Sequence, residues 1–265
     1  MTSTAVSPTP AAQPLLVLED ISKTFKLAGG GVLHAVRSVS LTVGAGEIVA
    51  LVGESGSGKS TLGRIALGLM QPDAGRVQFD GHSLTGLSSE QFRALRTGMQ
   101  PIFQDPTASL NPRKTVRELL MQASWKSPDA GEARCIKLLE DVGIRPAARY
   151  LDRYSHELSG GQRQRVSIAR SLAMEPKLIV ADEPLSGADV SIRGQVLNLL
   201  LDIQRSRSVA YLMITHDISI ARAFADRVAV MMQGELVEVG PAEQVLGRPS
   251  HPYTKRLVAA VPALG

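Results

Sequence analysis

The stretch LVGESGSGKST, residues 51–61, places three glycines and one lysine among small hydroxyl residues, directly after an apolar run. Residues 53–60 match the spacing Gly-x-x-x-x-Gly-Lys-Ser/Thr, in which the glycines let a loop curl so that its N–H groups surround phosphate oxygens. The preceding EIVALVG predicts a buried strand, and the following TLGRIALGL predicts a helix whose N-terminus favours anions. The stretch therefore predicts a P-loop that binds a nucleoside triphosphate.

Two side chains of this motif have separate expected tasks. Lys59 reaches the β- and γ-phosphates as a fixed positive charge, and Ser60 supplies a hydroxyl oxygen to Mg²⁺. The motif thus predicts ATP and Mg²⁺ as the ligands of the chain.

A second apolar run, KLIVADEP, ends in two acids, Asp182 and Glu183. Adjacent residues of an extended strand point to opposite sides, so the two carboxylates are free to do different work. We expect Asp182 to hold Mg²⁺ through water and Glu183 to polarise the attacking water. Without the P-loop, the same letters would indicate a strand-ending turn before Pro184 equally well.

Composition limits the remaining possibilities. The chain has 265 residues, 44% of them hydrophobic and 20% charged, which is typical of a globular protein. Its single cysteine, Cys135, excludes an internal disulfide, and we expect no iron–sulfur cluster. The net charge of +4 is mild, so nucleic acid is not an expected partner. Residues 1–14 predict a disordered lead-in, not a signal peptide.

The order of elements predicts an α/β fold with a mainly parallel sheet. Residues 15–43 read as short strands of an antiparallel edge subdomain, and helical spacing between about 88 and 158 predicts an inserted α-helical subdomain. Strands and helices then alternate up to a hairpin at 227–240. We expect one ATPase domain over 15–240 and a C-terminal tail over 241–265.

The segment HELSGGQRQRVSIARSLAMEPKLIVADEP, residues 156–184, resembles the ATP-binding cassette (ABC) ATPases. Their signature reads here Leu158-Ser159-Gly160-Gly161-Gln162. Taken alone, this block is a Ser-capped helix start, and Arg163 and Arg165 read as a solvated face. In the family, the signature binds ATP held by the P-loop of the opposite subunit, so the resemblance implies a head-to-tail dimer with two shared sites.

The resemblance assigns roles to further residues. Gln104 corresponds to the glutamine that touches Mg²⁺ and the attacking water, and His216 to the histidine that contacts the γ-phosphate and supports the glutamate. Phe25 stands where an aromatic stacks on adenine. The expected dimer-contact loop contains Ser186 and Asp189. The ATP-binding residues implied are Phe25, Gly53, Glu54, Ser55, Gly56, Ser57, Gly58, Lys59, Ser60 and Thr61, with Ser159, Gly160, Gly161 and Gln162 serving the opposite subunit; the catalytic residues are Lys59, Gln104, Glu183 and His216.

Finer details look like one branch of the family. FQDPTASLNPRKTV and the tail GPAEQVLGRPSHPYTKRLV are similar to ATPase subunits of bacterial oligopeptide, dipeptide and nickel importers. The resemblance implies a second ATPase chain, two permeases, an extracytoplasmic binding protein, and a place on the cytoplasmic face of the inner membrane. The alternatives are a soluble ABC ATPase that acts on ribosomes or DNA, and an exporter subunit.

Some residues depart from the family pattern, and others have only structural roles in our prediction. Residues 186–189 read SGAD where the family usually has SALD, and the helical insert is short. We expect structural roles for Trp125, as a partly buried aromatic, and for Cys135 and His156. Met231 and Met232 are expected in the core.

Overall fold

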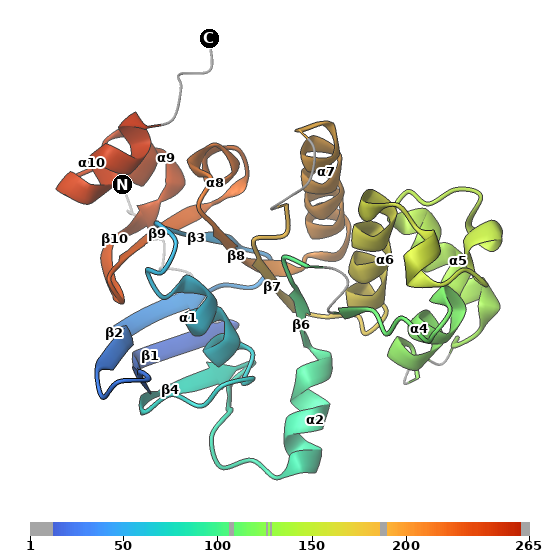
Figure 1. The fold of residues 1–265 in the computed structure, drawn as a ribbon, viewed down its shortest axis with the longest axis horizontal. Helices are drawn as coiled ribbons and strands as arrows, with labels where there is room; N and C mark the ends of the chain where they lie inside the picture. The colour runs from blue at the N-terminus through green and yellow to red at the C-terminus, as the bar shows by residue number, and fades with distance from the viewer. Residues whose placement is uncertain (1–12, 106–108, 126, 128, 186–189, 261–265) are drawn as a thin grey trace, which may run out of the picture.

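The computed structural model describes residues 13–105, 109–125, 127, 129–185 and 190–260 (Figure 1). Ser186 and Asp189, and all but the last two residues of the expected lead-in, lie outside this part. Within it, an N-terminal antiparallel sheet has the strand order β2-β1-β4-β5. The bounds are β1 Leu16–Lys26, β2 Val32–Val43, β4 Ala74–Phe79 and β5 His82–Ser83. The alternation of apolar and polar residues predicted this edge subdomain, and it is confirmed.

The second sheet is mainly parallel and has the order β10-β9-β3-β8-β7-β6 among the described residues. Only β10 runs antiparallel, to its neighbour β9. The bounds are β3 Ile48–Val52, β6 Met99–Ile102, β7 Leu178–Asp182, β8 Ala210–Thr215, β9 Arg227–Met232 and β10 Glu235–Pro241. Every residue of β3 and β8 is buried, as expected for central strands that are covered on both faces.

Helices cover both faces of this sheet (Figure 1). Leu62 and Ile65 of α1 pack between the two sheets, in one core with Val49 and Leu51 of β3. The next residue along β3, Ala50, faces a separate core with α8 and α9. The period of two along β3 therefore places one layer of helix on each side. The helix bounds are α1 Lys59–Ala66, α2 Ser89–Thr97, α4 Val116–Ala123, α5 Glu132–Asp141, α6 Gly160–Leu172, α7 Val190–Arg207, α8 Ile218–Phe224, α9 Ala242–Gly247 and α10 Pro252–Ala259.

The range expected for the inserted helical subdomain contains a strand as well as helices. Within the expected range, 88–158, β6 is a strand of the main sheet and pairs with β7. Only after β6 does the chain enter the cluster of α4, α5 and α6, which lies at one end of the molecule in Figure 1. Leu119, Leu138 and Val166 join these three helices in one buried core. We therefore propose that the inserted subdomain begins after β6.

In the described part of the chain, no helix has both the length and the apolar character needed to cross a bilayer.

A pair of leucines tests the layer between the sheets. Leu62 is fully buried, whereas Leu69, just past α1, is 42% exposed. Leu62→Ala should lower the free energy of unfolding by about 2–5 kcal/mol, because it leaves a cavity in a close-packed core. Leu69→Ala should change it by less than about 0.5 kcal/mol. Chemical denaturation measures both, and equal losses for the two variants would contradict this packing.

Candidate active site

The P-loop joins β3 to α1, and its shape depends on close backbone contacts. A Cβ on Gly53 would lie 2.1 Å from the Met231 carbonyl oxygen, and one on Gly58 would lie 2.1 Å from that of Ala35. Gly58 also has a φ of 105°, in the left-handed region. Glycine is required at both positions, because the loop passes directly against β9 and β2.

The loop wraps the side chain of Lys59, which is only 5% exposed. The Lys59 Nζ donates hydrogen bonds to the carbonyl oxygens of Gly53 and Glu54, both at 2.7 Å, and to Ser57 Oγ at 3.3 Å. Burial lowers the pKa of Lys59, while the carboxylates of Glu183 and Asp182 act in the opposite direction. The result is a positive charge fixed inside the loop.

The first acid of the β7 end lies beside this loop. Asp182 Oδ1 accepts a hydrogen bond of 2.9 Å from Ser60 Oγ, although the two residues are 122 positions apart. Burial raises the pKa of Asp182, and the bond from Ser60 partly offsets this. The pair brings two hard oxygen atoms together, which is the donor set that Mg²⁺ takes in proteins alongside water and phosphate oxygens. These residues therefore fit the expected metal.

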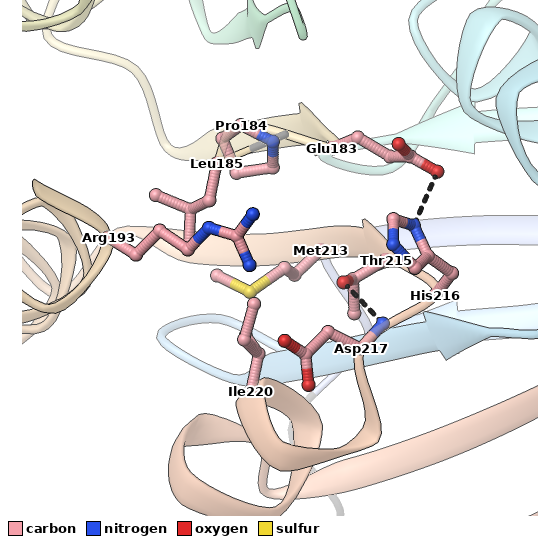
Figure 2. A pocket seen from close by; sticks show the side chains of 9 residues that line it. All are labelled: Glu183, Pro184, Leu185, Arg193, Met213, Thr215, His216, Asp217 and Ile220. Atoms are coloured by element: carbon pink, nitrogen blue, oxygen red, sulfur yellow. Dashed lines mark hydrogen bonds and ion pairs between the residues drawn. The ribbon is translucent and has the colours of Figure 1, made fainter. Parts of the chain in front are cut away.

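The second acid, Glu183, has a different partner from the first. Glu183 has a φ of 46°, a conformation that few non-glycine residues adopt, and its N–H donates to the Ile214 carbonyl at 2.9 Å. Its carboxylate meets His216, which follows β8, with 3.1 Å between Glu183 Oε1 and His216 Nδ1 (Figure 2). The backbone thus leaves the extended conformation at Glu183, and the carboxylate of this residue pairs with a histidine.

Glu183 and His216 border a small pocket of about 60 Å³ (Figure 2). Thr215 Oγ1 accepts a hydrogen bond from the Asp217 N–H at 3.0 Å, and Asp217 in turn caps α8, which fixes the turn that carries His216. The pocket is lined by Glu183, Pro184, Leu185, Arg193, Met213, Thr215, His216, Asp217 and Ile220.

Gln104 lies two residues beyond β6 and is exposed. Because Ile102 of β6 pairs with Ala181 of β7 in a parallel register, Gln104 follows the same edge of the sheet as Asp182 and Glu183. Its position therefore agrees with the role that the resemblance implies.

Phe25 is half-buried on β1, opposite Leu33 of β2. Two residues further along β2, Ala35 contacts the P-loop at Gly58. The aromatic ring is therefore one strand away from the loop, and the Lys23 Nζ lies 6.0 Å from the ring centroid.

The predicted signature forms the start of α6. Ser159 Oγ accepts from the Gln162 N–H, and Gln162 Oε1 accepts from the Ser159 N–H, which makes a capping box. Ser159 and Gly160 are exposed. In Figure 1 this helix lies with α4 and α5, away from α1, so the P-loop and the signature are separated in the folded chain.

Three further side chains of α6 were missed or misinterpreted. Gln164 is 7% exposed, and its Nε2 donates to the Pro184 carbonyl at 2.8 Å, which ties the signature helix to the segment after Glu183. The interpretation of Arg163 and Arg165 as a solvated face is wrong. Both are half-buried and donate to main-chain carbonyls, Arg163 to Leu158 and Arg165 to Val142. Sequence spacing carries no signal for such contacts.

The residues expected to be structural differ in outcome. Met231 is fully buried, as predicted, whereas Met232 is half-buried. Cys135 is also fully buried. Trp125 is 58% exposed, so its prediction as a partly buried aromatic is wrong. His156 stacks on the Tyr154 ring with centroids 5.6 Å apart.

Comparison with known sequences identifies the family. The family model described as ABC transporter matches residues 36–186, more than half of the chain. This chain belongs to the ABC transporter family. A second family model, described as the C-terminal region of oligopeptide/dipeptide transporters, matches residues 237–265.

Curated relatives point in the same direction. The glutathione import ATP-binding protein GsiA of Salmonella paratyphi A (strain ATCC 9150 / SARB42) is 46% identical over 260 residues, which cover 94% of this chain and 41% of the relative. The protein of the same name from Escherichia coli (strain K12) is 46% identical over 261 residues, with the same coverage. The chain therefore spans less than half the length of the curated relatives that it matches.

Solved structures of the family share the fold. The ATP-binding cassette MJ0796, solved as a dimer in a post-hydrolysis state with ADP and Pi, aligns with a TM-score of 0.76 and 29% identity over 86% of this chain and 98% of that one. The cbiO1 protein of Clostridium perfringens, part of the ABC transporter complex cbiONQ, aligns with a TM-score of 0.74 and 29% identity over 89% of this chain and 91% of that one. The α/β fold with a P-loop core is confirmed.

Two P-loop glycines, one packed against β2 and one with open space around it, test the structure of the loop. Gly58→Ala should weaken ATP binding at least tenfold, because its Cβ would overlap the Ala35 carbonyl and the loop would have to move. Gly56→Ala is the matched control: its φ is also positive, at 81°, but a Cβ there meets nothing within 4 Å. Gly56→Ala should lower the free energy of unfolding by about 1–2 kcal/mol, because of local backbone strain alone. Titration with a fluorescent ATP analogue measures the affinity of both variants, and equal affinity of wild type and Gly58→Ala would argue against the described loop.

Proposed function

We propose that this chain hydrolyses ATP and, as the motor subunit of a bacterial ABC importer, drives uptake of small peptides through partner permeases. The observation that carries the ATPase proposal is the single edge of the sheet where Lys59, the Ser60–Asp182 pair and the Glu183–His216 pair follow β3, β7 and β8. Import of peptides is supported by the second family model and by the name of the curated relatives.

The proposed chemistry divides among these side chains. Lys59 balances negative charge on the β- and γ-phosphates, from a position that the loop carbonyls already fix. Glu183 orients a water molecule and accepts its proton, while His216 holds the Glu183 carboxylate in place and contacts the γ-phosphate. Gln104, from the end of β6, would help to hold the metal and the attacking water. Ser60, and Asp182 through a water molecule, would hold Mg²⁺, which would supply positive charge that neutralises the phosphate oxygens.

A complete site in this proposal needs two chains. The P-loop of one subunit and residues 159–162 of the other contact the same ATP, since the two segments lie in different parts of one chain. The solved relative described as dimeric supports this arrangement. The Gly160 and Gly161 N–H groups, the first two of α6, have no acceptor within the helix, and a helix start of this kind favours an anion.

The proposed assembly contains a second ABC ATPase subunit, two transmembrane permeases and an extracytoplasmic binding protein, on the cytoplasmic face of the bacterial inner membrane. The proposed division of the chain is an ATPase domain over 15–240 and a tail over 241–265. Peptides are the favoured cargo, and nickel or metal chelates are the second cargo class of this branch. Substrate choice belongs to the binding protein and permeases in this proposal.

Glu183→Gln tests the catalytic assignment. The variant should lower kcat at least a hundredfold, because the amide cannot accept a proton, while its affinity for ATP changes less than about threefold. Glu140→Gln, an exposed position on α5, is the matched control and should retain wild-type turnover. Phosphate release and ATP titration measure the two effects. Undiminished turnover by Glu183→Gln would remove this residue from the proposed role.

A capture experiment tests the transport assignment. Tagged Glu183→Gln chain is purified from detergent-solubilised membranes of its native host with ATP present, and its partners are identified by mass spectrometry. Two multi-span permeases and a second ABC ATPase are expected. Ribosomal or DNA-repair proteins without a permease would instead favour the soluble ATPase, and would leave the proposed hydrolysis intact.

A further inference from the structure

A side chain of the C-terminal helix contacts the P-loop from outside. Tyr253, on α10, accepts a hydrogen bond from the Glu54 N–H with 3.0 Å between N and Oη, across 199 residues of sequence. The Tyr253 side chain is 4% exposed and packs in the core that contains Ala50 and Val52 of β3. A buried tyrosine hydroxyl therefore meets the main chain of the loop directly after the strand that carries it.

This contact acts on a peptide group that Lys59 also uses. The Gly53 carbonyl accepts from the Lys59 Nζ at 2.7 Å, and the Glu54 N–H belongs to the same peptide unit. In a planar trans peptide, the C=O and N–H bonds point in opposite directions. A hydroxyl that holds the N–H outward therefore holds the carbonyl inward, toward the ammonium.

The rest of this part of the loop has little packing. Glu54, Ser55 and Gly56 are exposed, and a hollow of about 550 Å³ separates this half of the loop from Arg256 and Leu257 of α10. A Cβ on Gly56 would meet nothing within 4 Å. The 53–54 peptide is therefore held on the Gly53 side by packing against β9, and its orientation further depends on its two hydrogen bonds.

Tyr253 is itself held firmly. The Glu238 carboxylate on β10 accepts from the Ser250 N–H at 2.8 Å and from the His251 N–H at 3.0 Å, and His251 Nδ1 accepts from the Tyr253 N–H at 3.2 Å. Burial alone would raise the pKa of Glu238, but the hydrogen bonds it accepts lower that pKa to about 2. The start of α10 is therefore anchored to the second sheet by an ionised carboxylate.

We propose that Tyr253 is a positioning residue for the P-loop, which sets the affinity for ATP by fixing the 53–54 peptide that holds Lys59. This inference rests on the proposed function, since it assumes that the loop binds ATP. It assigns a task to the C-terminal region matched by the second family model: that region braces the nucleotide site of its own chain.

Tyr253→Phe tests the proposal, because it removes the hydroxyl and keeps the ring. The loss of one hydrogen bond should weaken ATP binding about three- to tenfold. KM for ATP should rise by a similar factor, while kcat at saturating ATP stays within about twofold and the melting temperature without nucleotide stays within about 2 °C. Tyr211→Phe is the matched control: Tyr211 is also buried, and its hydroxyl has no hydrogen-bond partner among the described residues.

The outcomes separate the two proposals. Weaker ATP binding by Tyr253→Phe and unchanged binding by Tyr211→Phe would support the brace. Wild-type affinity in Tyr253→Phe would overturn it, as would a lower melting temperature with unchanged affinity, which would indicate a merely structural residue. If the wild-type chain itself does not bind ATP, the proposed function fails, and this inference fails with it.

Discussion

The buried ammonium of Lys59 constrains almost everything around it. A charge that is removed from water needs close hydrogen-bond acceptors, and the chain provides them by turning two P-loop carbonyls and a serine hydroxyl inward. That turn is sterically possible only because Gly53 and Gly58 have no side chain where the loop meets β9 and β2. Because β3 runs parallel to β8, and β8 runs parallel to β7, the acids at the end of β7 lie at the same edge of the sheet as the P-loop.

The two acids of this edge bind different partners. Asp182 continues the strand and meets Ser60, whereas the left-handed conformation of Glu183 turns its side chain toward the histidine that follows β8. Local strain of this kind persists only where surrounding contacts fix it. Here the fixing contacts are the hydrogen bond from the Glu183 N–H to the Ile214 carbonyl and the one from Gln164 to the Pro184 carbonyl.

The sequence predicts those parts of the molecule whose physics is local. The P-loop spacing, the uniformly apolar strands and the Ser-capped helix start each involve residues close together in the chain, and each is present. β6 was missed because it is four residues long and contains Pro101, which usually ends a strand. As an edge strand, β6 tolerates this proline. The roles of Gln164, Arg165 and Tyr253 were also missed, because a side chain that binds a distant carbonyl or N–H leaves no periodic pattern.

The separation between Glu54 and Tyr253 has a consequence for synthesis of the chain. During translation the P-loop leaves the ribosome about 200 residues before its brace. Its neighbouring strands, β8 and β9, also lie far downstream in sequence. A nascent chain therefore carries an unfinished nucleotide pocket while these residues are added. The contacts that complete this pocket become available only after Tyr253 has been made, which couples competence for ATP to folding of the region between the P-loop and α10.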